Sequence, residues 1–386
     1  MVILRIIFMV FMIIATLSGC DRNAPYDTEV TEAHRTEREL VPFDSIGIEM
    51  GDSNYVFGIP RALEFTSLGN IVVGDISKMK LLMYSPDGMF IRRGGSEGQG
   101  PGEYTAPTGI SSTRSGGIMV ADAMGGKLIF YDSLLSYTHE LAGFTPRPPE
   151  SPEIQIDGGI VGRSFVFDQE TGSLCNSLNR WEPGETETSF SYLERSSDFD
   201  QQNPRKVFQE TGINFCTLQD GRVIASPLST EEYTLICFST EGEVEWEIHP
   251  HFERQRRSEE DIEIEREMIR AAMRRNGRDP SYVDQMKFQE WSNAVTNLYT
   301  QGNRIWARRG GSLEPLFDIY STDGEYLYSC SVPSLPYGSS IGFAISPYSS
   351  NILAYMANPE DYSRIWMLRE EDRITGESFE DTSEVY

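Results

Sequence analysis

Asp75 and Asp122 occupy equivalent positions in two similar segments, IVVGD at 71–75 and IMVAD at 118–122. A ring of carboxylates at such positions could hold a metal ion. A carboxylate that directly follows a strand can instead accept hydrogen bonds from the backbone N–H groups of a nearby turn. The recurrence favours the turn role, because a functional site is asymmetric whereas a structural role repeats in every unit. We therefore expect these aspartates to cap turns.

The four histidines are His34, His139, His249 and His251. His249 and His251 flank a proline, but no Cys or carboxylate pattern completes a metal-ligand spacing around them. The Gly-x-Ser-x-Gly spelling occurs at 94–98 and at 338–342, but we interpret neither as the strand-to-helix nucleophile elbow to which that motif belongs. These motifs therefore predict no catalytic residue, no metal ligand and no cofactor.

The segment GGSEGQGPGE at 94–103 is rich in glycine. A glycine-rich loop cradles phosphate when a helix begins directly behind it, because the N–H groups of the first helical turn then face the anion. Here Pro107 and a strand-like segment follow instead. We interpret 94–103 as a crossover between two repeated units, in which the glycines permit close packing. Glu103 remains a candidate ligand-binding residue.

Cys20 ends an N-terminal segment that predicts export and lipid attachment. One charge, Arg5, precedes an apolar run from Ile6 to Leu17. This run is short for a spanning helix, which needs ~20 residues, and has the proportions of a secretory signal. It ends in LSGC, which resembles the bacterial lipobox, where the Cys thiol is alkylated with diacylglycerol and the chain is cut before the Cys. We predict a signal peptide at 1–19 and a lipid anchor at Cys20.

The two ends of the mature chain read as flexible segments. Residues 20–42 are polar and lack apolar periodicity, so we expect a tether that holds the body away from the membrane. Residues 370–386 are acidic and aperiodic, and we expect a disordered tail. The sequence leaves open which membrane carries the anchor.

Four further cysteines lie in strand-like apolar segments without metal-ligand spacing: Cys175, Cys216, Cys237 and Cys330. Isolated cysteines at strand positions are usually small buried residues. A disulfide is the alternative, because an exported protein meets an oxidising compartment.

Composition limits the class of partner. The chain of 386 residues carries a formal net charge of −26. This acidity argues against nucleic acid and against adsorption to anionic lipid, since both require a basic surface. The 34 glycines and 20 prolines indicate many turns and few long helices. The hydrophobic content of 39% suffices for a sizeable core.

An internal repeat determines the predicted fold. Residues 60–91 align with 107–138 at a constant offset of 47, and KLLMY at 80–84 matches KLIFY at 127–131. Each unit reads as four short strands, and weaker copies follow along the chain. Four-stranded units repeated around an axis make a β-propeller. A β-sandwich or two stacked all-β domains would have no reason to keep such a period.

The blade number follows from the length of the body, 43–369, once the non-repeating segment 251–290 is set aside. Six units of about 48 residues match the observed period best. Residues 45–49 stand at the phase of a fourth strand, 47 residues before the end of the first unit. We predict that this segment completes the last blade and closes the ring, which removes exposed sheet edges.

The segment 251–290, between blades 4 and 5, is predicted to be a helical insertion. Ser258 and Asp261 resemble a capping box at its start. Ile262, Ile269 and Met273 form an apolar stripe at helical spacing. The stripe favours packing on the propeller itself, and a lid or a partner-docking arm is a compatible alternative.

These motifs together resemble the six-bladed β-propeller lipoproteins of bacteria, which are similar to NHL-repeat and TolB-like propellers. The residues that carry the resemblance are the Gly-x-Ile-x-Val-x-Asp segments at 69–75 and 116–122 and the glycine-rich segment that ends at Tyr104. The resemblance implies an all-β, six-bladed β-propeller over most of 44–369. It implies little about activity.

The predicted function is that of a non-catalytic binding platform in the bacterial cell envelope, facing the periplasm or the exterior. Propeller faces present loops from every blade around a central depression, which suits a protein, peptide or glycan. The candidate ligand-binding residues are Arg61, Glu103, Arg308 and Arg309. Two alternatives remain, a metal-dependent lactonase- or lyase-like propeller enzyme and a structural subunit of an envelope complex.

Overall fold

The computed structural model describes the chain from Glu37 to Asp372 with short gaps. The described ranges are 37–75, 77–199, 204–275, 277–311, 314–333, 335, 341–356 and 362–372. The predicted signal peptide, Cys20, and most of the predicted tether and acidic tail lie outside these residues.

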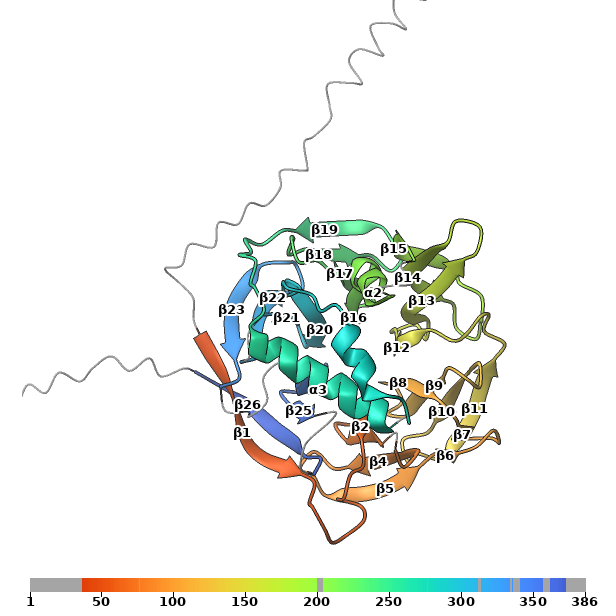
Figure 1. The fold of residues 1–386 in the computed structure, drawn as a ribbon. Coiled ribbons are helices and arrows are strands. Elements are labelled where there is room, and N and C mark those ends of the chain that lie inside the picture. Colours follow the sequence, from red (N-terminus) through yellow and green to blue (C-terminus); the bar gives the residue numbers. More distant parts are fainter. Residues whose placement is uncertain are drawn as a thin grey trace, which may run out of the picture.

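Six blades of four strands each surround a central axis (Figure 1). Blade 1 contains β2 (Pro60–Phe65), β3 (Ile71–Asp75), β4 (Lys80–Tyr84) and β5 (Phe90–Gly94). Blade 2 contains β8 (Pro107–Ser112), β9 (Ile118–Asp122), β10 (Lys127–Tyr131) and β11 (Tyr137–Ala142). Blade 3 contains β12 (Glu150–Ile154), β13 (Ile160–Asp168), β14 (Ser173–Trp181) and β15 (Phe190–Asp198). A short parallel pair, β6 (Ser96–Glu97) and β7 (Glu103–Tyr104), lies in the glycine-rich crossover between blades 1 and 2.

The remaining blades complete the ring. Blade 4 contains β16 (Ile213–Thr217), β17 (Val223–Pro227), β18 (Leu235–Phe238) and β19 (Val244–Ile248). Blade 5 contains β20 (Val295–Gln301), β21 (Arg304–Arg309), β22 (Leu316–Ser321) and β23 (Tyr326–Ser331). Blade 6 contains β24 (Ile341–Ile345), β25 (Ile352–Met356), β26 (Ile365–Asp372) and β1 (Glu37–Ile46). The predicted all-β, six-bladed architecture is confirmed.

Burial between neighbouring blades holds the ring together. All positions of β3 and β9 are buried, because each of these strands lies inside a sheet whose two faces are covered by the adjacent blades. The outer strand β11 is mostly exposed. Val72 and Met83 of blade 1 belong to the same apolar cluster as Ile118 and Val120 of blade 2. A single blade could not bury both of its faces alone.

Strand β1 closes the ring by bringing both ends of the chain into blade 6, as predicted. It pairs antiparallel with β26, from Arg38 opposite Asp372 to Ile46 opposite Ile365. The first residues of β1 also pair parallel with β23, so blades 5 and 6 share one continuous sheet.

The predicted boundaries of this closing strand were wrong. Residues 37–42, expected in the tether, belong to β1, and residues 370–372, expected in the tail, belong to β26. Residues 47–49, expected to continue the fourth strand, lie in the loop that follows β1. The physical reason is that the charged residues Arg38 and Glu39 are only half-buried. ERELVP therefore shows no apolar periodicity, although Arg38–Pro42 pair with β26 and the first three residues also pair with β23.

The insertion between β19 and β20 is helical, as predicted. It contains α3 (Glu259–Arg275) and the 3₁₀ helix η2 (Pro280–Gln285). Ser258 caps the helix as predicted, because its Oγ accepts a hydrogen bond from the Asp261 N–H at 3.0 Å; the hydroxyl in turn donates to Asp261 Oδ2 at 3.3 Å. Figure 1 shows α3 running across the front of the ring. A short helix that the sequence did not predict, α2 (Pro204–Thr211), connects β15 to β16.

The apolar stripe of α3 is half-buried at Ile262, Ile269 and Met273. Within the insertion, Arg270 Nη2 lies 2.7 Å from Asp284 Oδ1 of η2. The neck is closed by two backbone hydrogen bonds, from Arg257 N to Glu290 O and from Ser292 N to Gln255 O. The stripe is therefore partly shielded from solvent, and α3 is held to η2 and to the neck of the insertion. In the part of the chain that the structure describes, no helix is long and apolar enough to cross a membrane.

Asp75 and Asp122 cap loops, as predicted. Asp75 Oδ2 accepts a hydrogen bond from Gly58 N at 2.7 Å, and Asp122 Oδ1 accepts one from Ala106 N at 2.8 Å. Both donors lie directly before the inner strand of the same blade. These two carboxylates therefore fix the connections between blades.

The four cysteines inside the body are free thiols. Cys216, Cys237 and Cys330 are buried, and Cys175 is half-buried. The expectation that these cysteines act as small buried residues is confirmed for the first three.

Candidate functional site

A central channel runs along the inner strands of all six blades. Its volume is about 770 Å³, and its wall is supplied by β2, β8, β12, β16, β20 and β24. Small-molecule sites commonly occupy roughly 300–1,000 Å³. Ser67, Arg114, Gln219 and Tyr348, from loops that follow inner strands, line one end of the channel. The inner strands begin at the other end of the channel. The insertion that contains α3 leads into β20, the inner strand of blade 5, so α3 lies at that end.

Polar side chains on the inner strands join neighbouring blades at the channel wall. Ser111 Oγ of blade 2 accepts a hydrogen bond from the Ile154 N–H of blade 3 at 3.4 Å. Thr300 Oγ1 of blade 5 donates to the Thr217 carbonyl of blade 4 at 3.3 Å. These hydroxyl groups hold the ring in register, and their oxygens still face a channel that a ligand could enter.

Glu153 projects from β12 into this channel. Its Oε2 atom accepts two hydrogen bonds of 2.7 Å each, from the N–H and the hydroxyl of Thr217. Enclosure by the surrounding blades raises the pKa of Glu153 to about 7, and the two hydrogen bonds from Thr217 oppose that increase. Glu153 therefore holds its proton for part of the time at neutral pH.

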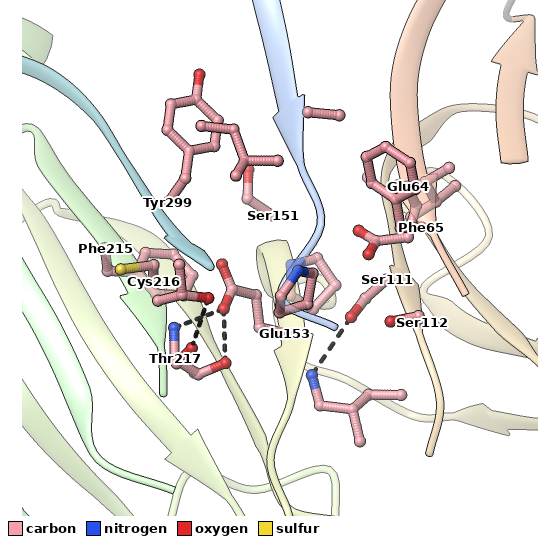
Figure 2. Close-up of a pocket in the computed structure, with 18 of the residues that line it drawn as sticks. Glu64, Phe65, Ser111, Ser112, Ser151, Glu153, Phe215, Cys216, Thr217 and Tyr299 are labelled. Carbon is pink, nitrogen blue, oxygen red and sulfur yellow. Dashed lines mark hydrogen bonds between the residues drawn. The ribbon is translucent and has the colours of Figure 1, made fainter. Parts of the chain in front are cut away.

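Glu64 projects from β2 into the same channel, as Figure 2 shows. Enclosure raises the pKa of Glu64 to about 8, and the negative charge of Glu153 adds to the increase. A hydrogen bond from Ser112 opposes it. The electrostatic coupling means that ionisation of one carboxyl group disfavours ionisation of the other.

Arg163 is a basic residue of the channel wall, but it is committed to other partners. Its Nη1 atom donates to the Ile213 carbonyl at 3.2 Å, and Nη2 donates to Ser151 Oγ at 3.1 Å. Burial lowers the pKa of Arg163. The guanidinium group thus supports blades 3 and 4 and orients the Ser151 hydroxyl.

Tyr299 and Tyr355 add aromatic rings to the wall. Burial raises the pKa of Tyr299, and the positive charge of the nearby Arg308 opposes the increase. The Tyr299 side chain is therefore a neutral phenol. Aromatic faces of this kind pack against the apolar face of a ligand while the phenol forms hydrogen bonds.

Of the four predicted ligand-binding residues, Glu103, Arg308 and Arg309 do not line the channel. Position 61 lies in β2, and its side chain is outside what the structure describes. Glu103 lies in β7, where Oε2 accepts a hydrogen bond from Gly100 N at 2.8 Å within the glycine-rich crossover. Arg308 is buried behind the wall, donates to the Ile341 carbonyl at 2.6 Å and lies over the Phe343 ring. Arg309 forms an ion pair with the buried Asp318.

Glu64 and Glu153 were not among the residues that the sequence predicted for the site. Glu64 is the only carboxylate of β2, and Glu153 shares β12 with Glu150; the local sequences are ALEFTS at 62–67 and SPEIQ at 151–155. An acidic residue on an innermost strand is a signal that could have identified them. Its meaning depends on which strands face the axis, and the repeat alone does not supply that information.

The described residues do not form a cluster of metal ligands. Among the described residues, no three or more His, Cys, Asp or Glu side chains are grouped so that they could hold a metal ion. The carboxylates that recur at equivalent positions, Asp75 and Asp122, are directed at backbone N–H groups instead.

Comparisons with known proteins agree with the architecture. Residues 39–143 match the model of a family, DUF5128, described as a 6-bladed β-propeller. No curated protein matches the sequence. Among solved structures, a protein of Bacteroides fragilis described as exported has a TM-score of 0.50 and 13% identity, covering 86% of this chain and 95% of its own. At that identity the likeness shows a shared fold.

Two further structures overlap less closely. A member of the DUF4221 family from Bacteroides vulgatus has a TM-score of 0.47 and 11% identity, covering 88% of this chain and all of its own. A gluconolactonase of Xanthomonas campestris has a TM-score of 0.46 and 11% identity, with 86% of this chain and 100% of that chain covered. The chain is therefore a six-bladed β-propeller that matches a propeller family over its first two blades and shares its fold with a bacterial exported protein.

Proposed function

We propose that this protein is an extracytoplasmic, lipid-anchored propeller that holds a small polar ligand in its central channel without transforming it. The observation that carries the proposal is the channel of about 770 Å³, to which all six blades contribute. Hydroxyl, carboxyl, amide and aromatic groups face one another across it. Such a mixture fixes the orientation of a ligand rich in hydrogen-bonding groups.

The proposed location rests on the sequence. The LSGC segment at 17–20 and the apolar run before it support export and lipid attachment at Cys20. The structural neighbour from Bacteroides fragilis is described as exported, which agrees with this location. The polar segment between Cys20 and β1 is long enough to separate the propeller from a membrane.

A binding role is supported by what the polar groups of the wall already do. The hydroxyl of Thr217 donates to Glu153, and that of Ser111 accepts from a backbone N–H. Neither hydroxyl has a histidine beside it in the channel wall that the structure describes, and the Thr217 hydroxyl is held by the carboxyl group of Glu153. The geometry thus orients groups for recognition.

The test uses calorimetric titration of the full-length protein in detergent with a panel of neutral, acidic and amino sugars from monosaccharide to trisaccharide. Ser67→Trp places a large ring at the open end of the channel, and Ser115→Trp places the same ring at an exposed position outside the wall. We expect saturable binding of at least one sugar that Ser67→Trp abolishes and Ser115→Trp preserves. Binding that survives Ser67→Trp would place the ligand elsewhere.

The alternative function, a lactonase-like enzyme, makes a different prediction in the same preparation. Hydrolysis of a sugar lactone in the presence of Ca²⁺, reduced by Glu64→Gln or Glu153→Gln, would replace the binding role with a catalytic one. A lactone that is bound and recovered unchanged supports the proposal.

A further inference from the structure

Glu64 and Glu153 differ from the other enclosed carboxylates of this protein. Asp318 is paired with Arg309, and Glu370 is paired with Arg38 and Arg304. Among the described residues, no Lys, Arg or His forms an ion pair with Glu64 or Glu153. Removing a carboxylate from bulk water is costly unless a cation or several donors compensate.

Hydrogen bonds offset only part of the cost of enclosing these two carboxyl groups. Both hydrogen bonds of Glu153 reach the same atom, Oε2, so Oε1 remains available to the channel. Glu64 is served by Ser112 and by the Phe65 backbone. Asp75, by comparison, accepts hydrogen bonds from several N–H groups and from Ser77. The channel thus contains two carboxyl groups whose capacity to bind a cation is unused within the described chain.

The basic and titratable groups around Glu64 and Glu153 do not neutralise these two carboxyl groups. Arg163 is held by a carbonyl oxygen and by Ser151. Arg114 lies at the exposed end of the channel. Tyr299, Tyr355 and Cys216 also line the wall, and burial raises the pKa of Tyr299 and of the Cys216 thiol. These two groups are therefore neutral at neutral pH and do not compete with Glu64 and Glu153 for a cation.

The rest of the wall suits a polyhydroxylated molecule. Ser111, Ser112, Ser151 and Thr217 bring hydroxyl groups to the carboxyl groups from three different inner strands, as Figure 2 shows. Tyr299 lies on a fourth inner strand and offers an aromatic ring. Hydroxyl groups can both donate and accept, as sugar hydroxyls require, and an aromatic ring packs against the C–H face of a sugar.

We propose that the channel binds an amino sugar with a free primary ammonium group, which pairs with the carboxylates of Glu64 and Glu153 while the channel hydroxyls bind the sugar hydroxyls. This inference rests on the function proposed above, because it names the class of ligand for the same channel. An ammonium group supplies three donors and the positive charge that the two carboxyl groups lack.

The raised pKa values provide a signature that packing alone would not give. Pairing with an ammonium group favours the ionised carboxylates, so protons held on Glu64 and Glu153 must leave when the ligand binds. Titration at about pH 5.5, where an amine of ordinary pKa is already protonated and takes up no further proton, in buffers of different ionisation enthalpy measures this release. We expect protons to be released on binding of an amino sugar and not on binding of a neutral sugar.

The experiment compares two ligands that differ only in the acetylation of their three amino groups. Full-length protein in detergent is titrated with the β-1,4-linked trisaccharide of glucosamine and with the same trisaccharide fully N-acetylated. We expect the amine form to bind at least about tenfold more tightly, the usual scale for one charge-assisted contact in a sheltered site. Equal affinity for the two forms would overturn this inference and leave the binding function in place.

Variants locate the effect. Glu64→Gln and Glu153→Gln each retain the shape of the side chain, and each is expected to reduce affinity for the amine form about fivefold or more and to reduce proton release. Glu170→Gln, at an exposed position of the β13–β14 hairpin, is the matched control and should change neither. Thermal unfolding of each variant verifies that the fold is retained. Unchanged affinity and proton release in a folded Glu64→Gln, Glu153→Gln double variant would refute the pairing.

A lysine peptide separates the two sources of an ammonium group. We expect an acetylated and amidated lysine tripeptide to bind more weakly than the glucosamine trisaccharide, because it lacks the sugar hydroxyls. Tighter binding of the peptide would overturn the assignment to an amino sugar. If no sugar on the wider panel binds, the proposed function fails as well.

Discussion

Replacing Glu153 by glutamine is expected to change how the stability of the propeller depends on pH. The carboxyl group has a pKa of about 7 in the folded protein, against an ordinary value of 4.5. The folded state therefore holds this proton more tightly than the unfolded chain does. The stabilisation is fully present below the unfolded pKa and is lost as the pH rises through the folded pKa.

The size of the effect follows from the difference between the two pKa values. That difference corresponds to about 3 kcal/mol of free energy of unfolding, and water in the open channel lowers the expected effect to about 2 kcal/mol. Glutamine has no proton to lose in this range. Relative to the wild-type protein, the variant should therefore gain about 2 kcal/mol of stability between pH 4.5 and pH 8.

The assay is urea denaturation of the wild-type protein, Glu153→Gln and the exposed control Glu170→Gln, at intervals from pH 4.5 to pH 8.5. The quantity compared is the difference in the free energy of unfolding between each variant and the wild type. The titration of groups that are not coupled to Glu153 largely cancels in it, and the easier ionisation of Glu64 in Glu153→Gln changes the difference in the same direction. We expect a difference that rises with pH for Glu153→Gln and stays level for Glu170→Gln. A level difference for Glu153→Gln would show that the channel does not retain the proton, and the account of the site would be wrong.

Three further outcomes follow from the fold. Leu40→Ala removes a fully buried side chain from β1 and should lower the free energy of unfolding by about 3–5 kcal/mol in urea denaturation; a loss below about 1 kcal/mol would contradict closure through this strand. Asp122→Ala leaves the N–H groups of Thr105 and Ala106 without their acceptor, so stability should fall by about 2 kcal/mol and hydrogen exchange at both amides should accelerate. Replacing 258–289 by a short Gly/Ser linker should leave the thermal midpoint nearly unchanged, because the neck retains its hydrogen bonds; loss of cooperative unfolding would show that the helix supports the ring.

The architecture was accessible from the sequence because it rests on local repetition. The 47-residue offset between 60–91 and 107–138 repeats the turn residues, the buried strand and the capping aspartate together. Asp75 and Asp122 could be assigned to loops for the same reason, since each carboxylate and the N–H groups that it accepts from lie within 17 residues of one another. The helical insertion carried its own capping signal at Ser258.

The closing strand was only partly predictable. Residues 37–42 have no apolar pattern of their own, because half-buried positions such as Arg38 and Glu39 tolerate charges. Their pairing partners stand more than 300 residues away in β26. A period read along the chain indicates that a strand is missing from the last blade, but it does not indicate where the missing strand begins.

The sequence by itself determined the repeating unit, the number of blades and the place of the helical insertion, since these depend on contacts between residues near one another in the chain. Only the tertiary structure decided which side chains share the axis. Glu64 and Glu153 belong to different blades, and their pKa values depend on enclosure by the whole ring. The sequence predicted Arg308 and Arg309 to be ligand-binding residues. In the fold, Arg308 donates to the Ile341 carbonyl and Arg309 pairs with Asp318. Burial and the distance between blades arise only when the ring closes, and they decide which groups remain free to bind a ligand.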